Sequence, residues 1–581
     1  MFYTKDHKTL DMFDPLDRYG PKRRKLLERS WAKVFRDDIL PELPIELLSN
    51  RYHEFMGRPS KELYAMLGLM ILQQMHDLTD EEAALDFAFD QMWHYALNIG
   101  GTSDTEAYVC PKSIWSMRSI LTEHDGYIAL FEAVTGKLAK VHKVDTSKQR
   151  LDSMHILSNM RHLGRIGLFV NTIKKFLVNL KRHHKQLFAA LDKELRNRYF
   201  PKRGESTFSM VKPSESARTL ESLGKDLFYL IERFKDTDSV AVMNSYQLLL
   251  RLFKEQCTVE QDAQTQGKKV VVKSNKEVPS DSLQNPSDPD AGYSGHKGKG
   301  YQMQIQETYS DKADKGDKQL SLITYVSVEA ANKSDANALI PAIKDTQQRG
   351  LGPEEVLADA TYGGDDNCEK AKEIGVEVVA PAPGPDTHKT ISLADFKLSE
   401  RGEVIACPQG HSPLRTKHKK NRYTASFNSQ YCKGCPRLSS CPVVAGKKAY
   451  YLRYDDKTIR LATRRAYEKT PEFRDRYRFR AGIEATNSEL DRKTGVKRLR
   501  FRGLKAVSLA ATLKAAALNI LRAAAFRART QDANSATVCA KQVLLGKIIV
   551  FKEQCWSKLM DLSAKCLPNV SGYHFGLQIA V

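Results

Sequence analysis

Residues 356–380 constrain the fold more than any other part of the chain. Residues 356–358 are predicted to form a short buried strand, which Asp359 follows directly. Gly363 and Gly364 then turn the chain into a helix that ends at Gly375, and residues 376–380 form a second strand. A strand, a helix and a strand in succession indicate a parallel pair with a right-handed crossover. Functional side chains in open α/β sheets gather at the carboxyl ends of strands, where Asp359 is expected to lie.

The remaining strands of this sheet are predicted from shorter patterns. Residues 301–309 and 320–328 alternate apolar and polar side chains on either side of a charged turn, which indicates an antiparallel hairpin. Residues 148–156 form a short strand that contains Asp152; taken alone, Asp152 would be interpreted as a solvated residue. The order strand, hairpin, strand, helix, strand is that of a ribonuclease H-like α/β fold with a mixed five-stranded sheet. Asp152 would then lie on the first strand and Asp359 at the end of the fourth.

A third carboxylate lies on a predicted helix over residues 477–490. Phe479, Ile483 and Leu490 recur at helical spacing and are expected to face a core. Arg480 and Glu484 share a neighbouring stripe, because residues four apart lie on one face of a helix. On this helix alone, the more ordinary interpretation is a surface ion pair that contributes little to stability. In the predicted fold, the same helix would bring Glu484 beside Asp152 and Asp359.

Helical periodicity dominates the other long segments. In the N-terminal part, Thr79 and Glu82 have the spacing of a capping box. Short capped helices of this kind fit a helix-turn-helix DNA-binding region and an ordinary small bundle equally well. A polar stretch at 267–299 is expected to be a loop. The predicted division of the chain is a helical DNA-binding or dimerisation domain at 1–145, a catalytic core at 146–156 and 300–400, a helical insertion and loop at 157–299, a cysteine-rich insertion at 401–446, the C-terminal helices of the core at 447–528, and a tail without an interpretable signal at 529–581.

Charge and hydropathy favour a polyanionic partner inside the cell. The net charge is +21, with basic clusters at 22–25, 417–420 and 474–502, and nucleic acid is the usual partner of such a protein. The most apolar run, near 504–526, is interrupted by Lys505, Lys514, Asn519 and Arg522, so we expect no membrane span. The first residues lack a basic segment followed by an apolar one, and we expect a cytoplasmic, nucleoid-associated protein.

Four of the ten cysteines form a cluster in the sequence. Cys407, Cys432, Cys435 and Cys441 fall within 35 positions and include one CxxC pair. In a reducing compartment this spacing indicates a structural tetrahedral Zn²⁺ site, and His411 could replace one thiolate. The other six are scattered and are each interpreted as small buried hydrophobic residues: Cys110, Cys257, Cys368, Cys539, Cys555 and Cys566.

With these motifs assembled, the chain resembles the DDE transposases of bacterial insertion sequences, in the group whose last motif combines Tyr, Arg, Glu and Lys. Tyr477, Arg480 and Glu484 match that spacing, but Asp491 stands at the lysine position, with Lys493 two residues further on. The segments RLDSMHI around Asp152 and VLADATYGG around Asp359 resemble the two earlier motifs. The N-terminal helical part is similar to the domain that precedes the catalytic core in one subgroup.

The resemblance implies cleavage and joining of DNA by phosphoryl transfer, in which Asp152, Asp359 and Glu484 hold Mg²⁺ or Mn²⁺. Two such ions can stabilise the attacking and leaving oxygens of an in-line displacement. Double-stranded DNA, both element ends and target, is the implied partner, and the resemblance implies that a homodimer binds it. The residues expected to contact its phosphates are Tyr477, Arg480, Lys493, Lys497, Arg498, Arg500 and Arg502.

Two other functions stay open at this point. The Asp491 departure leaves room for a catalytically inactive transposase remnant that only binds DNA. A ribonuclease H-type nuclease with another substrate would use the same three acids, although the long helical N-terminal region and the basic C-terminal flank fit the recognition of element ends better.

Overall fold

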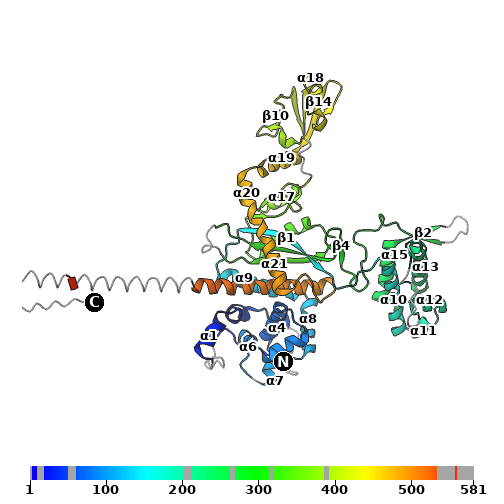
Figure 1. Ribbon diagram of the computed structural model, residues 1–581, viewed down its shortest axis with the longest axis vertical. Helices are drawn as coiled ribbons and strands as arrows, with labels where there is room; N and C mark the ends of the chain where they lie inside the picture. Colours follow the sequence, from blue (N-terminus) through cyan, green and yellow to red (C-terminus); the bar gives the residue numbers. More distant parts are fainter. Residues whose placement is uncertain are drawn as a thin grey trace, which may run out of the picture.

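The computed structural model describes residues 3–9, 19–49, 60–101, 103–201, 208, 211–261, 268–312, 319–384, 391–532 and 557–558. They form a mixed α/β core, a bundle of N-terminal helices, a helical body at one side and a small β-rich subdomain at one end (Figure 1). Cys539, Cys555 and Cys566 lie outside the described residues.

The central sheet contains the strands that the sequence predicts. In spatial order they are β6 (Ile323–Ala330), β5 (Gly298–Thr308), β1 (Lys148–Leu157), β7 (Glu355–Leu357) and β8 (Glu377–Val379). β5 is antiparallel to both β6 and β1, whereas β1, β7 and β8 are parallel to one another. A sixth strand of three residues, β4 (Gly292–Ser294), also pairs with β5. The predicted hairpin and the predicted parallel pair are therefore confirmed, and the short strand β4 is an addition.

The two faces of the sheet pack against different helices. Leu151 and Val356 belong to a cluster with α16 (Leu339–Gln348) and α17 (Asp365–Glu373). Met154 and Ile305, on the opposite face, belong to the largest cluster of the chain. β1 thus has a side chain buried on each face in turn, as expected for a strand in the middle of a covered sheet.

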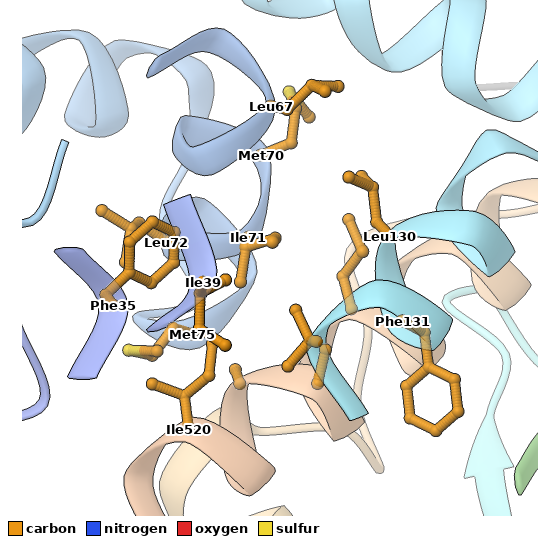
Figure 2. Close-up of a cluster of buried hydrophobic side chains, with 14 of the residues drawn as sticks. Phe35, Ile39, Leu67, Met70, Ile71, Leu72, Met75, Leu130, Phe131 and Ile520 are labelled. Carbon is orange, nitrogen blue, oxygen red and sulfur yellow. The ribbon is translucent and has the colours of Figure 1, made fainter. Parts of the chain in front are cut away.

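A long helix, Leu504–Asp532, joins the sheet to the N-terminal helices. It runs between them in Figure 1, and the close-up in Figure 2 shows Ile520 beside Phe35, Ile39 and Met75. The helix is long and apolar enough to cross a membrane, but 78% of its most apolar stretch is buried within the protein. It is therefore a core helix, and its apolar character is explained by burial on nearly every side.

The N-terminal helices pack against this long helix. Thr79 and Glu82 form the predicted capping box at the start of α5 (Asp80–Phe89). The helical elements of this part are α1 (Pro21–Glu28), α2 (Trp31–Val34), α3 (Glu46–Ser49), α4 (Leu63–Met75), α5 (Asp80–Phe89), α6 (Gln91–Ala96), α7 (Asp104–Ala107), α8 (Pro111–Glu123) and α9 (Gly126–Val141).

The helical insertion after β1 has a hydrophobic cluster of its own. Its elements are α10 (Arg165–His183), α11 (Lys185–Ala189), α12 (Lys193–Tyr199), α13 (Ser216–Phe234), α14 (Asp238–Ala241), α15 (Asn244–Gln256), β2 (Cys257–Gln261) and β3 (Lys268–Val272). The prediction of a loop at 267–299 is wrong at the two ends of the segment, where β3 pairs with β2 and β4 pairs with β5. The β-branched run Val270–Val272 favours a strand and explains the first difference.

Residues 391–455 form the small subdomain, which we call the arm. Its four-stranded sheet has the order β11 (Arg415–Lys419), β12 (Arg422–Asn428), β14 (Ala449–Asp455), β13 (Val444–Ala445). Shorter elements complete it: β9 (Lys397–Leu398), β10 (Val404–Ala406) and α18 (Ser429–Lys433). The helix α19 (Asp456–Glu468) leads from the arm back to the core (Figure 1).

Candidate functional site

The three predicted acids come from three elements at one end of the sheet. Asp152 is on β1, Asp359 follows β7 by two residues, and Glu484 is on α21 (Gly482–Thr494). Because β1 and β7 are parallel neighbours, the carboxyl ends of both strands point the same way. α21 packs against β1, which brings the third acid to the same end.

Arg480 joins two of these acids directly. Its Nη2 lies 3.1 Å from Oδ2 of Asp152, and its Nη1 lies 3.1 Å from Oε1 of Glu484. Asp152 and Glu484 are separated by more than 300 positions in sequence, so this contact is a property of the fold. The Asp152 side chain is 12% exposed and the Glu484 side chain 67% exposed. The site therefore has a buried side at Asp152 and an open side at Glu484.

Burial sets the electrostatics of Asp152. It raises the pKa of this carboxyl above 3.8, and the nearby charge of Asp359 raises it further, while Arg480 and the backbone N–H of Ser153 act in the opposite direction. Asp359 is thus within electrostatic reach of Asp152, and one of its oxygens accepts a 2.8 Å hydrogen bond from the backbone N–H of Thr361. A half-buried carboxylate pair of this kind concentrates negative charge beside the guanidinium of Arg480.

The segment 477–490 differs from the single helix that its periodicity predicts. α20 (Pro471–Tyr477) ends at Tyr477, a 3₁₀ turn covers Arg478–Ala481, and α21 begins at Gly482. Ile483 and Leu490 are fully buried, as predicted. The tighter turn is stabilised from outside, because Arg150 Nη1 donates a 2.6 Å hydrogen bond to the carbonyl oxygen of Phe479. In a continuous α-helix, the carbonyl oxygen of Phe479 would instead accept a hydrogen bond from the backbone N–H four residues later.

Gly482 allows this contact. A Cβ atom added at Gly482 would lie 2.0 Å from Nη1 of Arg150. Arg150 cannot easily withdraw, because its guanidinium is also 2.7 Å from Oε1 of Glu307. Gly482 is therefore required by the close approach of a neighbouring side chain.

Glu307 is the centre of a buried polar network that sequence reasoning missed. Its side chain is fully buried on β5 and pairs with Arg150 and with Arg522 of the long helix, at 2.9 Å. The hydroxyl of Thr486, two residues after Glu484, donates to Glu307 at 2.8 Å. A signal was present in the sequence: Glu307 occupies an apolar position of the alternating strand, and Arg522 interrupts an apolar run. The network fixes the 3₁₀ turn Arg478–Ala481 and α21 against the sheet and so orients Arg480 and Glu484.

The C-terminal end of α21 is held in a similar way. Lys514, on the long helix, is fully buried and donates to Asp77 Oδ1 at 2.8 Å and to the carbonyl oxygen of Thr494. Its ammonium group also lies 3.3 Å from the carbonyl oxygen of Gln74, near the end of α4. A cation is favourable at helix C-termini, and this one joins the ends of two helices.

The other predicted DNA contacts are mostly engaged within the protein. Tyr477 is partly buried and stacks on Phe473 with 5.2 Å between ring centroids. Lys493 pairs with Glu489 at 2.7 Å and Lys497 with Asp491 at 3.8 Å. Arg500 bonds the carbonyl oxygen of Asp77, Arg502 bonds that of Asn159, and Arg498 is exposed without an ion pair in the described part of the chain. Asp491, at the lysine position of the motif, thus neutralises one of the cations that follow it.

The four clustered cysteines line one cavity in the arm. Burial raises the pKa of the Cys432 thiol, and the proximity of Cys441, Cys407 and Cys435 raises it further. The His411 ring, considered as a replacement ligand, is stacked parallel to Tyr431 at 4.5 Å. The chemistry of this donor set fits a thiolate-bound Zn²⁺.

Neither cluster is arranged as a finished metal site. Among the described residues, no group of three or more His, Cys, Asp or Glu side chains could hold a metal ion as they stand. At the three acids the reason is visible, because the Arg480 guanidinium lies between Asp152 and Glu484. In both clusters the ligand atoms are of a kind that binds divalent cations, but their present positions do not form a binding site. The side chains would therefore have to move before an ion could bind.

Comparison with known proteins adds one finding. Residues 406–524 match the family model described as "Transposase DDE domain". The match covers about a fifth of the chain, including the four cysteines and Glu484 but neither Asp152 nor Asp359. It supports a DDE-type transposase, an enzyme that acts on DNA. No significant match was found to a curated protein or to a solved structure.

Proposed function

We propose that this protein is a DNA transposase that cleaves the ends of an insertion sequence and joins them to target DNA by phosphoryl transfer. The observation that carries the proposal is the bridge from Arg480 to Asp152 and Glu484, beside Asp359, within a chain whose C-terminal part matches a transposase family model. The strand order β6–β5–β1–β7–β8, with β5 antiparallel, supports a ribonuclease H-like core.

The three carboxylates would serve as ligands for Mg²⁺ or Mn²⁺. Hard divalent cations prefer oxygen ligands and are commonly held by one or two carboxylates together with substrate phosphates. Such ions, when bound, stabilise the attacking and leaving oxygens of the displacement. For Asp152 and Glu484 to bind an ion together, Arg480 has to leave its position between them. We propose that a DNA phosphate takes over the guanidinium, since arginine binds phosphate and carboxylate in the same bidentate way.

The chain's own residues divide the remaining work. Arg480 would bind the phosphate next to the scissile bond, and the Arg150–Glu307–Thr486 network would hold the turn that carries Arg480 against the sheet while its side chain moves. Tyr477 would line the same face, with its ring held by stacking on Phe473. In the arm, the four cysteines would hold a structural Zn²⁺, which leaves no open position for a substrate.

DNA flanking the gene provides the substrate that tests this proposal. Purified protein is incubated with a labelled fragment carrying those flanks, with Mg²⁺ or with a chelator. We expect metal-dependent nicks at defined positions, lost in Asp359→Asn and Glu484→Gln but retained in Glu472→Gln, which changes an exposed acid on α20. Sequence-independent binding without nicking under all metal conditions would instead favour an inactive DNA-binding remnant.

A further inference from the structure

A large share of the positive charge of the chain lies in the arm. Between Glu403 and Asp455 the sequence contains ten Lys and Arg residues and no Asp or Glu. This segment of 51 residues carries nearly half of the net charge of +21. Charge that is not compensated nearby repels itself, and a polyanionic partner relieves that repulsion.

Strand register places five of these cations on one face of the arm's sheet. Directly opposed residues of antiparallel strands share a face, and successive residues alternate between faces. Lys417 opposes Thr424, which opposes Arg453, and the neighbouring rows hold Arg415 beside Ser426 and Lys419 beside Arg422. The basic face is therefore formed by Arg415, Lys417, Lys419, Arg422 and Arg453, with the hydroxyl groups of Thr424 and Ser426 between them. The same register places Tyr451 opposite Ser426 and Asp455 opposite Arg422 on this face.

The opposite face of the same sheet is the core of the arm. Tyr423, Phe427 and Tyr454 are buried there, and the rings of Tyr423 and Tyr454 stack at 5.1 Å. The sheet thus has one apolar and one basic surface. The division follows directly from the two-residue period of strands and leaves the five cations exposed.

None of the five basic side chains forms an ion pair within the described part of the chain. Arginines in the neighbouring helices behave differently: Arg460 pairs with Asp365 at 2.6 Å and Arg476 pairs with Glu377 at 2.7 Å. The cations that follow Glu484 are likewise mostly bonded internally. The basic face is thus a surface whose cations form no ion pairs among the described residues.

We infer that the basic face of the arm binds the phosphate backbone of duplex DNA outside the catalytic end of the sheet. This inference rests on the proposed function, which makes DNA the substrate. Lysine, arginine and hydroxyl side chains are the groups that contact phosphates, and such contacts position a protein without reading sequence. Proteins that hold single strands stack bases on several aromatic rings, whereas Tyr423, Phe427 and Tyr454 face the core of the arm and Tyr451 is the one ring of this sheet that shares the face of the five cations. A duplex therefore fits this surface better than a single strand.

Salt-dependent binding by the full-length chain tests the inference. All proteins carry Asp152→Asn so that cleavage does not interfere, and the probe is a fluorescent duplex of arbitrary sequence. The arm variant is K417Q/K419Q/R453Q; its matched control, K344Q/K370Q/K372Q, removes the same charge from exposed lysines of α16 and α17. A charge-preserving variant, K417R/K419R/R453K, separates charge from local structure.

Each lost phosphate contact lowers the slope of log K against log salt by about 0.9. We expect the arm variant to lower it by about two to three units and to weaken binding at low salt by tenfold or more, with the control and the charge-preserving variant close to the parent. An unchanged slope in the arm variant, or tighter binding of a single strand than of the duplex by the parent, would overturn the inference. Cleavage of element ends is assayed separately. If the protein does not cleave ends but its DNA binding still depends on the arm, the proposed function is refuted and the inference about the arm is not.

Discussion

The Arg150 guanidinium lies 2.7 Å from Oε1 of Glu307, whose side chain is completely shielded from solvent. The pair joins neighbouring strands of the sheet, and through it Arg150 reaches the carbonyl oxygen of Phe479 in the turn that carries Arg480. Glu307 also accepts from Thr486 on the helix that carries Glu484. One buried carboxylate therefore controls the position of both side chains that approach Asp152.

Glu307→Gln should destabilise the protein strongly. The substitution leaves Arg150 as a buried cation without its counter-ion, whereas Arg522 keeps its ion pair with Glu489 at 2.8 Å. Removing one partner of a buried ion pair costs about 3–5 kcal/mol of unfolding free energy. Chemical denaturation measures the loss, and Glu373→Gln on the exposed side of α17 should stay within about 0.5 kcal/mol of wild type. Equal stability of the two variants would show that the network does not hold the core.

Gly482→Ala should reduce DNA cleavage more than it reduces stability. The new methyl group would overlap Nη1 of Arg150, which must then give up its bond to the Phe479 carbonyl oxygen. Arg480 would lose its orientation, and we expect tenfold or greater loss of cleavage, because misplacement of a positioning group by about 1 Å can cost 10²-fold. Gly136→Ala is the matched control: it lies in α9 with open space around it, so alanine should stabilise that helix by about 0.5–1 kcal/mol. Full cleavage activity of Gly482→Ala would show that the bond from Arg150 to Phe479 is not needed to position Arg480.

The parts of this fold that the sequence predicts are those with local periodicity. The strands at 148–156 and 301–309 and the parallel pair around Asp359 are confirmed because each has an unambiguous pattern of buried side chains. The turn at Arg478–Ala481 was missed because its cause, Arg150, lies more than 300 positions away. The bridging role of Arg480 was missed for a similar reason: its spacing to Glu484 was visible, whereas its contact with Asp152 depends on how α21 packs against β1.

The cysteine cluster predicts about one Zn²⁺ per chain. Cys432, Cys435, Cys407 and Cys441 line one cavity, so four thiolates are available to one ion after their side chains rearrange. Elemental analysis of the purified protein should find zinc, and Cys435→Ser should lower its content and the thermal stability of the arm. Cys368→Ser, a cysteine on α17 outside the cluster, should change neither. Zinc-free protein of wild-type stability would exclude a structural metal in the arm.

Asp152→Asn should abolish cleavage and raise stability at neutral pH. Burial raises the pKa of Asp152 above its ordinary value of 3.8, so the folded state binds a proton more tightly than the unfolded state does. As pH rises from 3.8 through the raised pKa, the wild type therefore loses stability that the uncharged asparagine does not lose. The free energy of unfolding, measured from pH 3 to pH 8, should be equal for the two proteins below pH 3.8. Above that pH it should become increasingly larger for Asp152→Asn than for the wild type. The opposite trend, with the variant less stable at neutral pH, would mean that the ion pair with Arg480 outweighs the cost of burying the carboxylate.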